Sequence, residues 1–346
     1  MRIAVYKDNL STGRGADSAV RNFANGLGER GSTVALMEKA EFFARVLAPD
    51  IAAGGAEADD FDVIVATGSN EIVDMDMAGY FSRQHRAKVV LQLHLAPRGF
   101  FKWKHPVRNR RIRAAFNRPD AVQLLCSSYG AEFRRIAPHP QIFIIGNFAS
   151  STNPSQIPNS QFPIPNSHTI LYPAATVNRV KNQKLLIEAF ALVAREFPEW
   201  NMRLLGKSGT PYAASCRRLI ARKGLASRIE LVGFTCDLAS EYARAAFIAF
   251  PSTLEGFPLA VLEAAQFALP AVAQKGLPGV SDIIHDGETG SVADASASAY
   301  AAALRRLMSD VALCRRLGEN ARRFCAERYS REHILDQWEN LLAQLK

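Results

Sequence analysis

Residues 250–265 of this chain have the sequence FPSTLEGFPLAVLEAA, and they indicate how the chain folds. The first of them ends an apolar run, 246–250, that is typical of a buried parallel strand, and Pro258 is typical of the first turn of a helix. Glu263 lies among apolar residues of that predicted helix, where a carboxylate without a partner is costly. A strand, a loop and a helix with one buried acid predict an α/β fold whose loop contains a site.

Spacing alone leaves two interpretations of the acids open. In the first, Glu255 on the loop and Glu263, about one turn into the helix, bind hydroxyl groups of a ligand that lies across the helix N-terminus. Free N–H groups at Leu259 and Ala260 and the positive end of the helix dipole then hold a phosphate. In the second, the helix belongs to the core and Glu263 forms an ordinary salt bridge.

The stretch resembles the E-x7-E signature of the family 4 retaining glycosyltransferases, in the form PSxxEGFPLxxLEA. The resemblance is strong over residues 169–292 and weaker before them. It implies the GT-B fold, in which two doubly wound Rossmann-like domains face each other across a cleft. It also implies that Glu263 holds the ribose hydroxyls of a sugar nucleotide and Glu255 those of the transferred sugar, with Gly256 and Phe257 in the same donor-binding loop.

Length and composition limit the class of protein. A chain of 346 residues, 48% apolar and 22% charged, is long enough for two domains of about 150 residues each. Its five cysteines are far apart, with no C-x-x-C pair, so neither a disulfide framework nor a zinc site is predicted. The N-terminus lacks the pattern of a signal peptide, and no run reaches the ~18 apolar residues of a membrane span. We therefore expect a cytoplasmic protein.

The first half of the sequence alternates short apolar runs with helix-like stretches. Such alternation predicts a parallel, doubly wound sheet, in which ligands bind beyond the carboxyl ends of the strands. The predicted strands are residues 2–6, 33–37, 62–67, 88–94, 121–126 and 141–145, and the predicted helices include residues 16–29 and 127–136.

A glycine-rich loop, 11–18, follows the first predicted strand. Bare glycine backbone approaches a phosphate or a sugar closely, and Gly13 and Gly15 resemble the family's glycine turn that faces the donor. The loop also matches part of the dinucleotide fingerprint G-x-G-x-x-G, with Ser18 at the third glycine. That alternative is disfavoured, because residues 7–12 separate the strand from Gly13, whereas a dinucleotide turn starts at the end of the strand.

Three further residues raise the question of a catalytic or metal site. His94 ends the fourth predicted strand, where a histidine is commonly structural, but this one resembles the family's histidine that approaches the transferred sugar. Asp74 and Asp76 form the D-x-D pattern with which other glycosyltransferase folds bind a divalent cation. They lie in a helix-like stretch and are interpreted as surface charge, so no metal site is predicted.

Residues 98–118 have the most unusual composition in the chain, with eight Lys or Arg and no acid, interleaved with Phe100, Phe101 and Trp103. This mixture favours an anionic acceptor, such as a phosphorylated glycolipid, or an anionic surface at the inner face of the cell membrane. A solvated basic face with its aromatics in the core is the competing interpretation. Single-stranded nucleic acid ranks lower, because no nucleic-acid-binding module accompanies the stretch. The candidates on the acceptor or membrane side are Arg98, Lys102, Trp103, Lys104, Arg108 and Arg111.

A stretch poor in charge and rich in Pro, Asn and Ser, residues 151–168, divides the chain as a linker. After it come predicted strands at 169–173, 202–205, 229–232, 247–250 and 271–273 and a helix at 185–194. We expect an N-terminal Rossmann-like domain on the acceptor side, 1–150, and a C-terminal Rossmann-like domain that binds the sugar nucleotide, 169–346. The last helix is expected to pack back on the N-terminal domain.

The turn at 181–183, sequence KNQ, resembles the family's turn whose lysine, here Lys181, neutralises the donor diphosphate. The family has an arginine five residues earlier, where this chain has Thr176, and Arg179 is the candidate substitute. By the same resemblance, the strands that line the base pocket are followed by Gly206, Lys207 and Phe234.

Three classes of function compete. The first is a retaining, metal-independent glycosyltransferase that moves a sugar from a UDP- or GDP-linked donor to a saccharide or lipid-linked acceptor, in polysaccharide, lipopolysaccharide or glycolipid synthesis. The second is another enzyme of the fold, such as a sugar-nucleotide epimerase or a phosphorylase, and the third is a non-catalytic binding module. The presence of both Glu255 and Glu263 argues against a binding module, and the basic stretch favours the transferase. Apart from the sugar nucleotide no cofactor is predicted, and no nucleic acid is expected as a partner.

Overall fold

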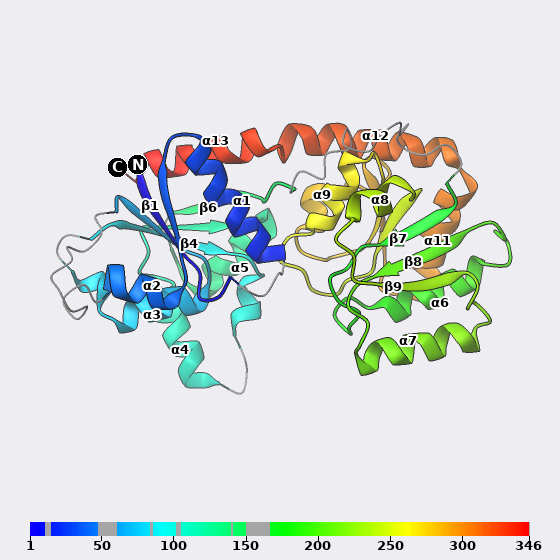
Figure 1. Cartoon of the computed structure of the whole chain (residues 1–346), viewed down its shortest axis with the longest axis horizontal. Helices are drawn as coiled ribbons and strands as arrows, with labels where there is room; N and C mark the ends of the chain where they lie inside the picture. The colour runs from blue at the N-terminus through cyan, green and yellow to red at the C-terminus, as the bar shows by residue number, and fades with distance from the viewer. Residues whose placement is uncertain are drawn as a thin grey trace. The chain divides into compact units, whose positions relative to one another are not determined.

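The computed structural model describes residues 1–10, 15–47, 61–83, 86–101, 105–139, 141–149 and 167–345. The chain divides into two compact units, Met1–Phe148 with Arg331–Lys346, and Ala149–Ser330. Each unit contains a six-stranded parallel sheet covered by helices (Figure 1). The predicted α/β architecture of two doubly wound sheets is confirmed.

The sheet of the first unit has the strand order β2-β1-β3-β4-β5-β6. Its strands are β1 (Arg2–Tyr6), β2 (Thr33–Met37), β3 (Val63–Ala66), β4 (Lys88–Leu93), β5 (Ala121–Leu124) and β6 (Ile142–Ile144). The central strands β3 and β5 are buried along their whole length, as parallel strands between two helical layers must be. The order reverses between β1 and β3, the kind of switch point at which doubly wound folds bind ligands.

The helices of the first unit are α1 (Gly15–Glu29), α2 (Lys39–Phe42), α3 (Ser69–Met77), α4 (Pro106–Ala115), α5 (Ser127–Ile136) and α13 (Arg331–Ala343), with short helical segments η1 (Phe43–Leu47), η2 (Tyr80–Ser82) and η3 (Pro97–Phe100). In α1 the buried residues Val20, Phe23, Ala24 and Leu27 recur every three or four positions, which is the spacing of a helix with one apolar face.

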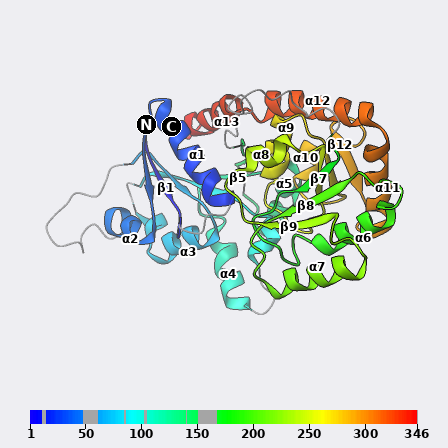
Figure 2. The same cartoon turned by 45° about the vertical axis from the view of Figure 1, so that its right-hand side comes forward.

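Helix α13 lies beside α1 in both views (Figures 1 and 2). The Trp338 ring packs on Phe23 with ring centroids 4.3 Å apart, and Arg30 forms ion pairs with Asp336 and Glu339 at 2.5 and 3.0 Å. The last helix is therefore part of the first unit, and the second unit ends at Ser330 rather than at the C-terminus.

The sheet of the second unit has the order β12-β11-β10-β7-β8-β9, with its switch point between β7 and β10. Its strands are β7 (Thr169–Tyr172), β8 (Asn201–Leu205), β9 (Ile229–Gly233), β10 (Phe247–Phe250), β11 (Ala271–Gln274) and β12 (Gly290–Ala293). Strand β12 is absent from the sequence-based prediction, because its residues GSVA form no apolar run.

The helices of the second unit are α6 (Gln183–Val193), α7 (Pro211–Arg222), α8 (Leu238–Ala243), α9 (Leu259–Gln266), α10 (Val280–Ile283), α11 (Ala297–Ser309) and α12 (Val311–Arg328). The side chains of Thr210, Ser296 and Asp310 accept N–H groups in the first turns of α7, α11 and α12. Such caps satisfy donors that have no partner inside the helix.

Candidate functional site

The carboxyl ends of β7 and β10 lie at the switch point of the second sheet, and the loops that follow them contain the predicted donor-site residues. Residue Thr253 ties the two loops together, because its N–H and its hydroxyl both donate to the Val180 carbonyl, at 2.8 and 3.1 Å. The fold therefore brings Lys181 and Glu255, which are 74 positions apart in the sequence, to one edge of the sheet.

Lys181 and Glu255 form an ion pair, with the Lys181 ammonium 2.5 Å from Glu255 Oε1. Their side chains are 23% and 12% exposed, so the pair is partly shielded from water. The ammonium also lies 5.8 Å from the centre of the Phe250 ring. An anionic ligand that binds Lys181 therefore competes with Glu255 for the same cation.

A buried tyrosine supports these loops from below. The Tyr172 hydroxyl donates to the Lys181 carbonyl at 2.7 Å and shares a hydrogen bond with the Ser252 hydroxyl at 2.9 Å. Burial raises the pKa of Tyr172 well above its usual value. The hydroxyl thus stays protonated and holds the backbone of Lys181 in place.

Glu263 lies in the second turn of α9, half-buried, and accepts a hydrogen bond from the Tyr242 hydroxyl at 2.8 Å. Burial raises the pKa of Glu263, and the hydrogen bond from Tyr242 opposes that rise. In the part of the chain that the structure describes, no Lys, Arg or His forms an ion pair with Glu263. The carboxylate therefore keeps lone pairs for ligand hydroxyls, and the salt-bridge interpretation is not supported.

The N-terminus of α9 differs from the prediction at one donor. The Leu259 N–H was expected to be free, which is wrong: it donates to the Phe257 carbonyl at 2.9 Å. Pro258, with φ −81° and ψ 71°, closes a three-residue turn that makes this contact. The Ala260 N–H has no acceptor in the described residues, so it remains the donor for an anion here, next to the buried Gly256 and Phe257.

The ends of β8 and β9 contain the residues predicted for the base pocket. Gly206 has φ +124°, and a Cβ there would lie 2.6 Å from the Ala174 carbonyl, so only glycine fits. The Lys207 ammonium lies 5.5 Å from the centre of the Phe234 ring, which is 59% exposed. This ring offers a surface on which a planar base can stack.

Arg179 lies exposed in the loop after β7, and within the described ranges its guanidinium has no ion-pair partner. Thr176, at the position of the family's arginine, instead forms a β-bridge with Lys207. The guanidinium of Arg179 is therefore available to an anionic ligand.

In the first unit, His94 follows β4 at the carboxyl edge of the sheet and is only 8% exposed. Among the described residues, neither of its ring nitrogens has a hydrogen-bond partner. Burial and the charge of Lys7 lower the pKa of His94 to about 3, against the opposing charge of Asp17. A neutral imidazole with both nitrogens unsatisfied offers a donor and an acceptor to a ligand hydroxyl.

Several predicted residues lie where the structure gives no description. Gly13, Lys102, Trp103 and Lys104 lie outside the described residues, and of Arg98 the side chain is not described. Gly15 is the first residue of α1.

The described part of the basic stretch includes α4, where Arg108 and Arg111 lie one turn apart. The rings of Phe100 and Phe101 pack edge-on against the buried Phe116, with centroids 6.0 and 6.1 Å away. For these two rings the packing agrees with the competing interpretation, in which the aromatics belong to the core. None of the helices in the described ranges is long and apolar enough to cross a membrane.

The D-x-D acids are held by other side chains. Asp74 accepts a hydrogen bond from the Tyr6 hydroxyl at 2.9 Å and pairs with Lys39 at 2.8 Å, and Asp76 pairs with Arg118 at 3.1 Å. Both acids are thus more deeply engaged than the surface charge expected from the sequence. Across the described ranges, no three His, Cys, Asp or Glu side chains lie together in a way that could hold a metal ion.

Two site residues were not predicted from the sequence. Tyr172 ends a strand, and nothing in its neighbourhood distinguishes it from a core aromatic. Tyr242 lies on α8, 21 positions before Glu263, and it meets the acid only through tertiary packing. The sequence indicates that the buried Glu263 needs a hydrogen-bond donor, but it does not indicate which tyrosine supplies it.

The chain is similar to known proteins in sequence and in fold. Residues 157–324 match the family model "Glycosyl transferases group 1". An exopolysaccharide phosphotransferase of Streptomyces coelicolor is 37% identical over 161 residues, 46% of this chain and 17% of that protein. The poly(glycerol-phosphate) alpha-glucosyltransferase of Bacillus subtilis is 25% identical over 257 residues, 73% of this chain and 37% of that protein. The matched part of this chain thus spans less than half the length of each of these relatives.

The crystal structure of HepE from Anabaena in complex with UDP and glucose is similar to the whole chain, with a TM-score of 0.78, 20% identity, and coverage of 99% of this chain and 100% of that one. A likeness at this level of identity shows the fold, which is GT-B. Lys181, Glu255 and Glu263 all lie in the segment that matches the family model. Residues 157–324 of this chain are therefore similar to the glycosyl transferases group 1 family.

Proposed function

We propose that the protein is a retaining glycosyltransferase that moves a sugar from a nucleotide-diphosphate sugar to a saccharide or lipid-linked acceptor. The observation that carries the proposal is the pair of acids around the start of α9. Glu255 is bound to a lysine and Glu263 to a neutral tyrosine, so one acid is linked to a cation that suits a diphosphate and the other is open to hydroxyl groups.

In this proposal the donor diphosphate binds Lys181, Arg179 and the Ala260 N–H, at the positive end of α9. Glu263 accepts hydrogen bonds from the ribose, and the exposed Phe234 ring stacks on the base. HepE is described with UDP and glucose bound, which supports a UDP-linked donor for this chain as well.

The reaction breaks the bond between the anomeric carbon and the diphosphate oxygen and forms a bond from that carbon to an acceptor oxygen. The proton of the acceptor hydroxyl goes to the departing diphosphate. Retention follows when the leaving group and the acceptor occupy the same face of the sugar. Glu255 and His94 bind hydroxyls of the transferred sugar, and no step requires a metal ion.

The acceptor in this proposal is anionic, as the basic α4 favours. One relative is named for its action on poly(glycerol phosphate), a phosphate-rich acceptor, which supports this class. Association with the inner face of the cell membrane is part of the same proposal, and it rests on charge rather than on insertion of Phe100 or Phe101.

The test is calorimetric titration of the protein with UDP-glucose and with GDP-mannose, separately. Glu263→Gln is expected to weaken binding of the true donor by about 1–3 kcal/mol, because a hydrogen bond to a charged group is lost. Glu188→Gln removes the same charge from an exposed position on α6 and is expected to bind like the native protein. An unchanged dissociation constant in Glu263→Gln would contradict the assignment of Glu263 to the donor ribose.

A further inference from the structure

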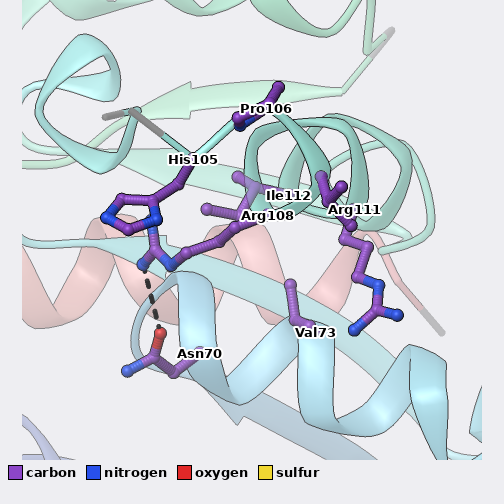
Figure 3. Close-up of a pocket in the computed structure, with 8 residues that line it drawn as sticks. Asn70, Val73, His105, Pro106, Arg108, Arg111 and Ile112 are labelled. Carbon is purple, nitrogen blue, oxygen red and sulfur yellow. Dashed lines mark hydrogen bonds between the residues drawn. The ribbon is translucent and has the colours of Figure 1, made fainter. Parts of the chain in front are cut away.

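The first unit contains a pocket between α3 and α4, with a volume of about 440 Å³ (Figure 3). Its lining comes from α3, from α4 and from the residue before α4, and it includes Asn70, Val73, His105, Arg108, Arg111 and Ile112. Figure 3 shows the side chains of Arg108 and Arg111 on either side of Val73. The pocket is thus lined by both apolar and cationic side chains.

The positive charge of the pocket lining is not neutralised within the described residues. Helix α4 contains four arginines and no acid, and none of the four forms an ion pair in the ranges that the structure describes. Arg108 donates to the Phe100 carbonyl at 2.7 Å and to Asn70 Oδ1 at 3.5 Å, both neutral acceptors. The described contact of Arg111 is with the Met77 sulfur, at 4.0 Å. A cationic pocket without a protein counter-charge favours an anion.

The size and polarity of the pocket narrow the class of anion. Two guanidinium groups one helical turn apart can hold different oxygens of one tetrahedral group, which suits phosphate. Val73 and Ile112 offer no hydrogen bonds, so the rest of the ligand is carbon-rich in the part that they contact. The start of α4 adds the positive end of a helix dipole to the same pocket.

We propose that the pocket between α3 and α4 binds the phosphate group of a phosphate ester, with Arg108 and Arg111 on the phosphate and Val73 and Ile112 against the carbon part. If the protein is the transferase proposed above, this ligand is the acceptor, so that part of the inference rests on the proposed function. Binding of a phosphate ester to the pocket does not depend on it.

Arg111 gives the cleaner variant, because Arg108 also holds the Phe100 carbonyl and its loss disturbs the loop before α4. Arg111→Gln is compared with Arg110→Gln, which removes the same charge from a neighbouring exposed position of α4 outside the pocket lining. Both variants are exposed on the same helix, so each is expected to fold like the native protein.

Binding is measured by isothermal titration with inorganic phosphate and with glycerol phosphate, and by co-sedimentation with vesicles of phosphatidylglycerol in phosphatidylcholine. Arg111→Gln is expected to weaken binding roughly tenfold, and Arg110→Gln to leave it near the native value, since of these two arginines only Arg111 lines the pocket. Dependence on Arg111 in the titrations indicates a free phosphate ester. The same dependence with vesicles alone indicates a lipid headgroup.

Two results overturn the proposal: no binding of any probe at low salt, or equal losses in Arg110→Gln and Arg111→Gln, which would indicate attraction to a diffuse positive surface. Titration with UDP in the same two variants separates this inference from the proposed function. If UDP binds and phosphate esters do not, the proposed phosphate-ester site is wrong and the proposed donor site stands. If phosphate esters bind and UDP does not, the phosphate-ester site stands and the proposed transferase function is wrong.

Discussion

At the scale of single residues, the ion pair between Lys181 and Glu255 links the two ends of the proposed donor. Glu255→Ala frees Lys181 for the diphosphate, so binding of UDP is expected to stay equal or become tighter. Turnover of UDP-glucose is expected to fall by about 100-fold, because the group proposed to bind the sugar is gone. Titration with UDP and initial-rate measurements check the two effects, with Glu199→Ala, an exposed acid of the same unit, as the control. Equal losses of UDP and UDP-glucose binding would mean that Glu255 does not contact the sugar.

Glu263 makes a second prediction at this scale, for stability against pH. Burial raises its pKa above the ordinary value of 4.5, so the folded protein holds this proton more tightly than the unfolded chain. The resulting stabilisation is complete below pH 4.5 and is lost as the pH rises through the folded pKa. Glu263→Gln cannot ionise and is therefore expected to match the native protein in acid and to be more stable at neutral pH.

Urea unfolding of both proteins at the two ends of this range measures the difference. A Gln variant that is less stable at neutral pH would show that the carboxylate is stabilised in the fold after all. Together with the weaker donor binding proposed for the same variant, the expected result means that the site keeps an acid at a cost in stability.

At the scale of elements, α13 belongs to the first unit although the whole second unit separates it from residues 1–148 in the sequence. Trp338 is 2% exposed and packs on Phe23 of α1. Trp338→Ala is expected to destabilise the first unit by about 3–5 kcal/mol, because a large buried ring is replaced by a cavity. Asn340→Ala, at an exposed position of the same helix, is expected to change stability by less than about 0.5 kcal/mol.

Differential scanning calorimetry tests this prediction when it is run with and without UDP. In Trp338→Ala the transition that does not respond to UDP is expected to move to lower temperature. Equal shifts of all transitions, or no shift, would contradict the assignment of α13 to the first unit.

The elements also show how far the sequence predicts the fold. Strands β1, β2 and β10 begin and end at the predicted residues, because each is an apolar run between polar turns. Strand β12 has no such run, and its place in the sheet depends on pairing with β11, which local sequence does not encode. The turn at Pro258 that occupies the Leu259 N–H is likewise a matter of backbone geometry, and a proline before a helix is compatible with several geometries.

The site was predictable to the extent that its residues form a local pattern. Glu255 and Glu263 belong to one motif, and Lys181 to another, so the sequence identifies all three. Their partners do not follow from it: the contact of Glu263 with Tyr242 and the packing of Phe100 and Phe101 on Phe116 are made between elements. For the same reason the pocket beside α4 appears in the sequence only as a cluster of arginines.

At the scale of the whole molecule, the chain has a net charge of +9. The two acids considered as metal ligands, Asp74 and Asp76, already form ion pairs with protein side chains. Asp74 and Asp76 would have to release Tyr6, Lys39 and Arg118 before they could bind a cation. Lys181, by contrast, needs only to exchange the Glu255 carboxylate for a phosphate oxygen. Neutralisation of the donor diphosphate by protein cations therefore requires fewer broken contacts than neutralisation by a metal ion on Asp74 and Asp76. We expect the transfer reaction to continue unchanged in EDTA.

Lys181→Ala is expected to lower the rate by about 100-fold, because one preorganised charge at the leaving diphosphate is removed. Lys223→Ala removes an equal charge from an exposed position in the same unit and is expected to keep the native rate, which separates the local effect from the loss of net charge. Initial rates of sugar transfer from UDP-glucose, with and without EDTA, measure all three proteins. Activity that disappears in EDTA and returns with Mn²⁺ would contradict the metal-independent route, and it would require the three ion-pair and hydrogen-bond partners of the D-x-D acids to give way to a metal ion.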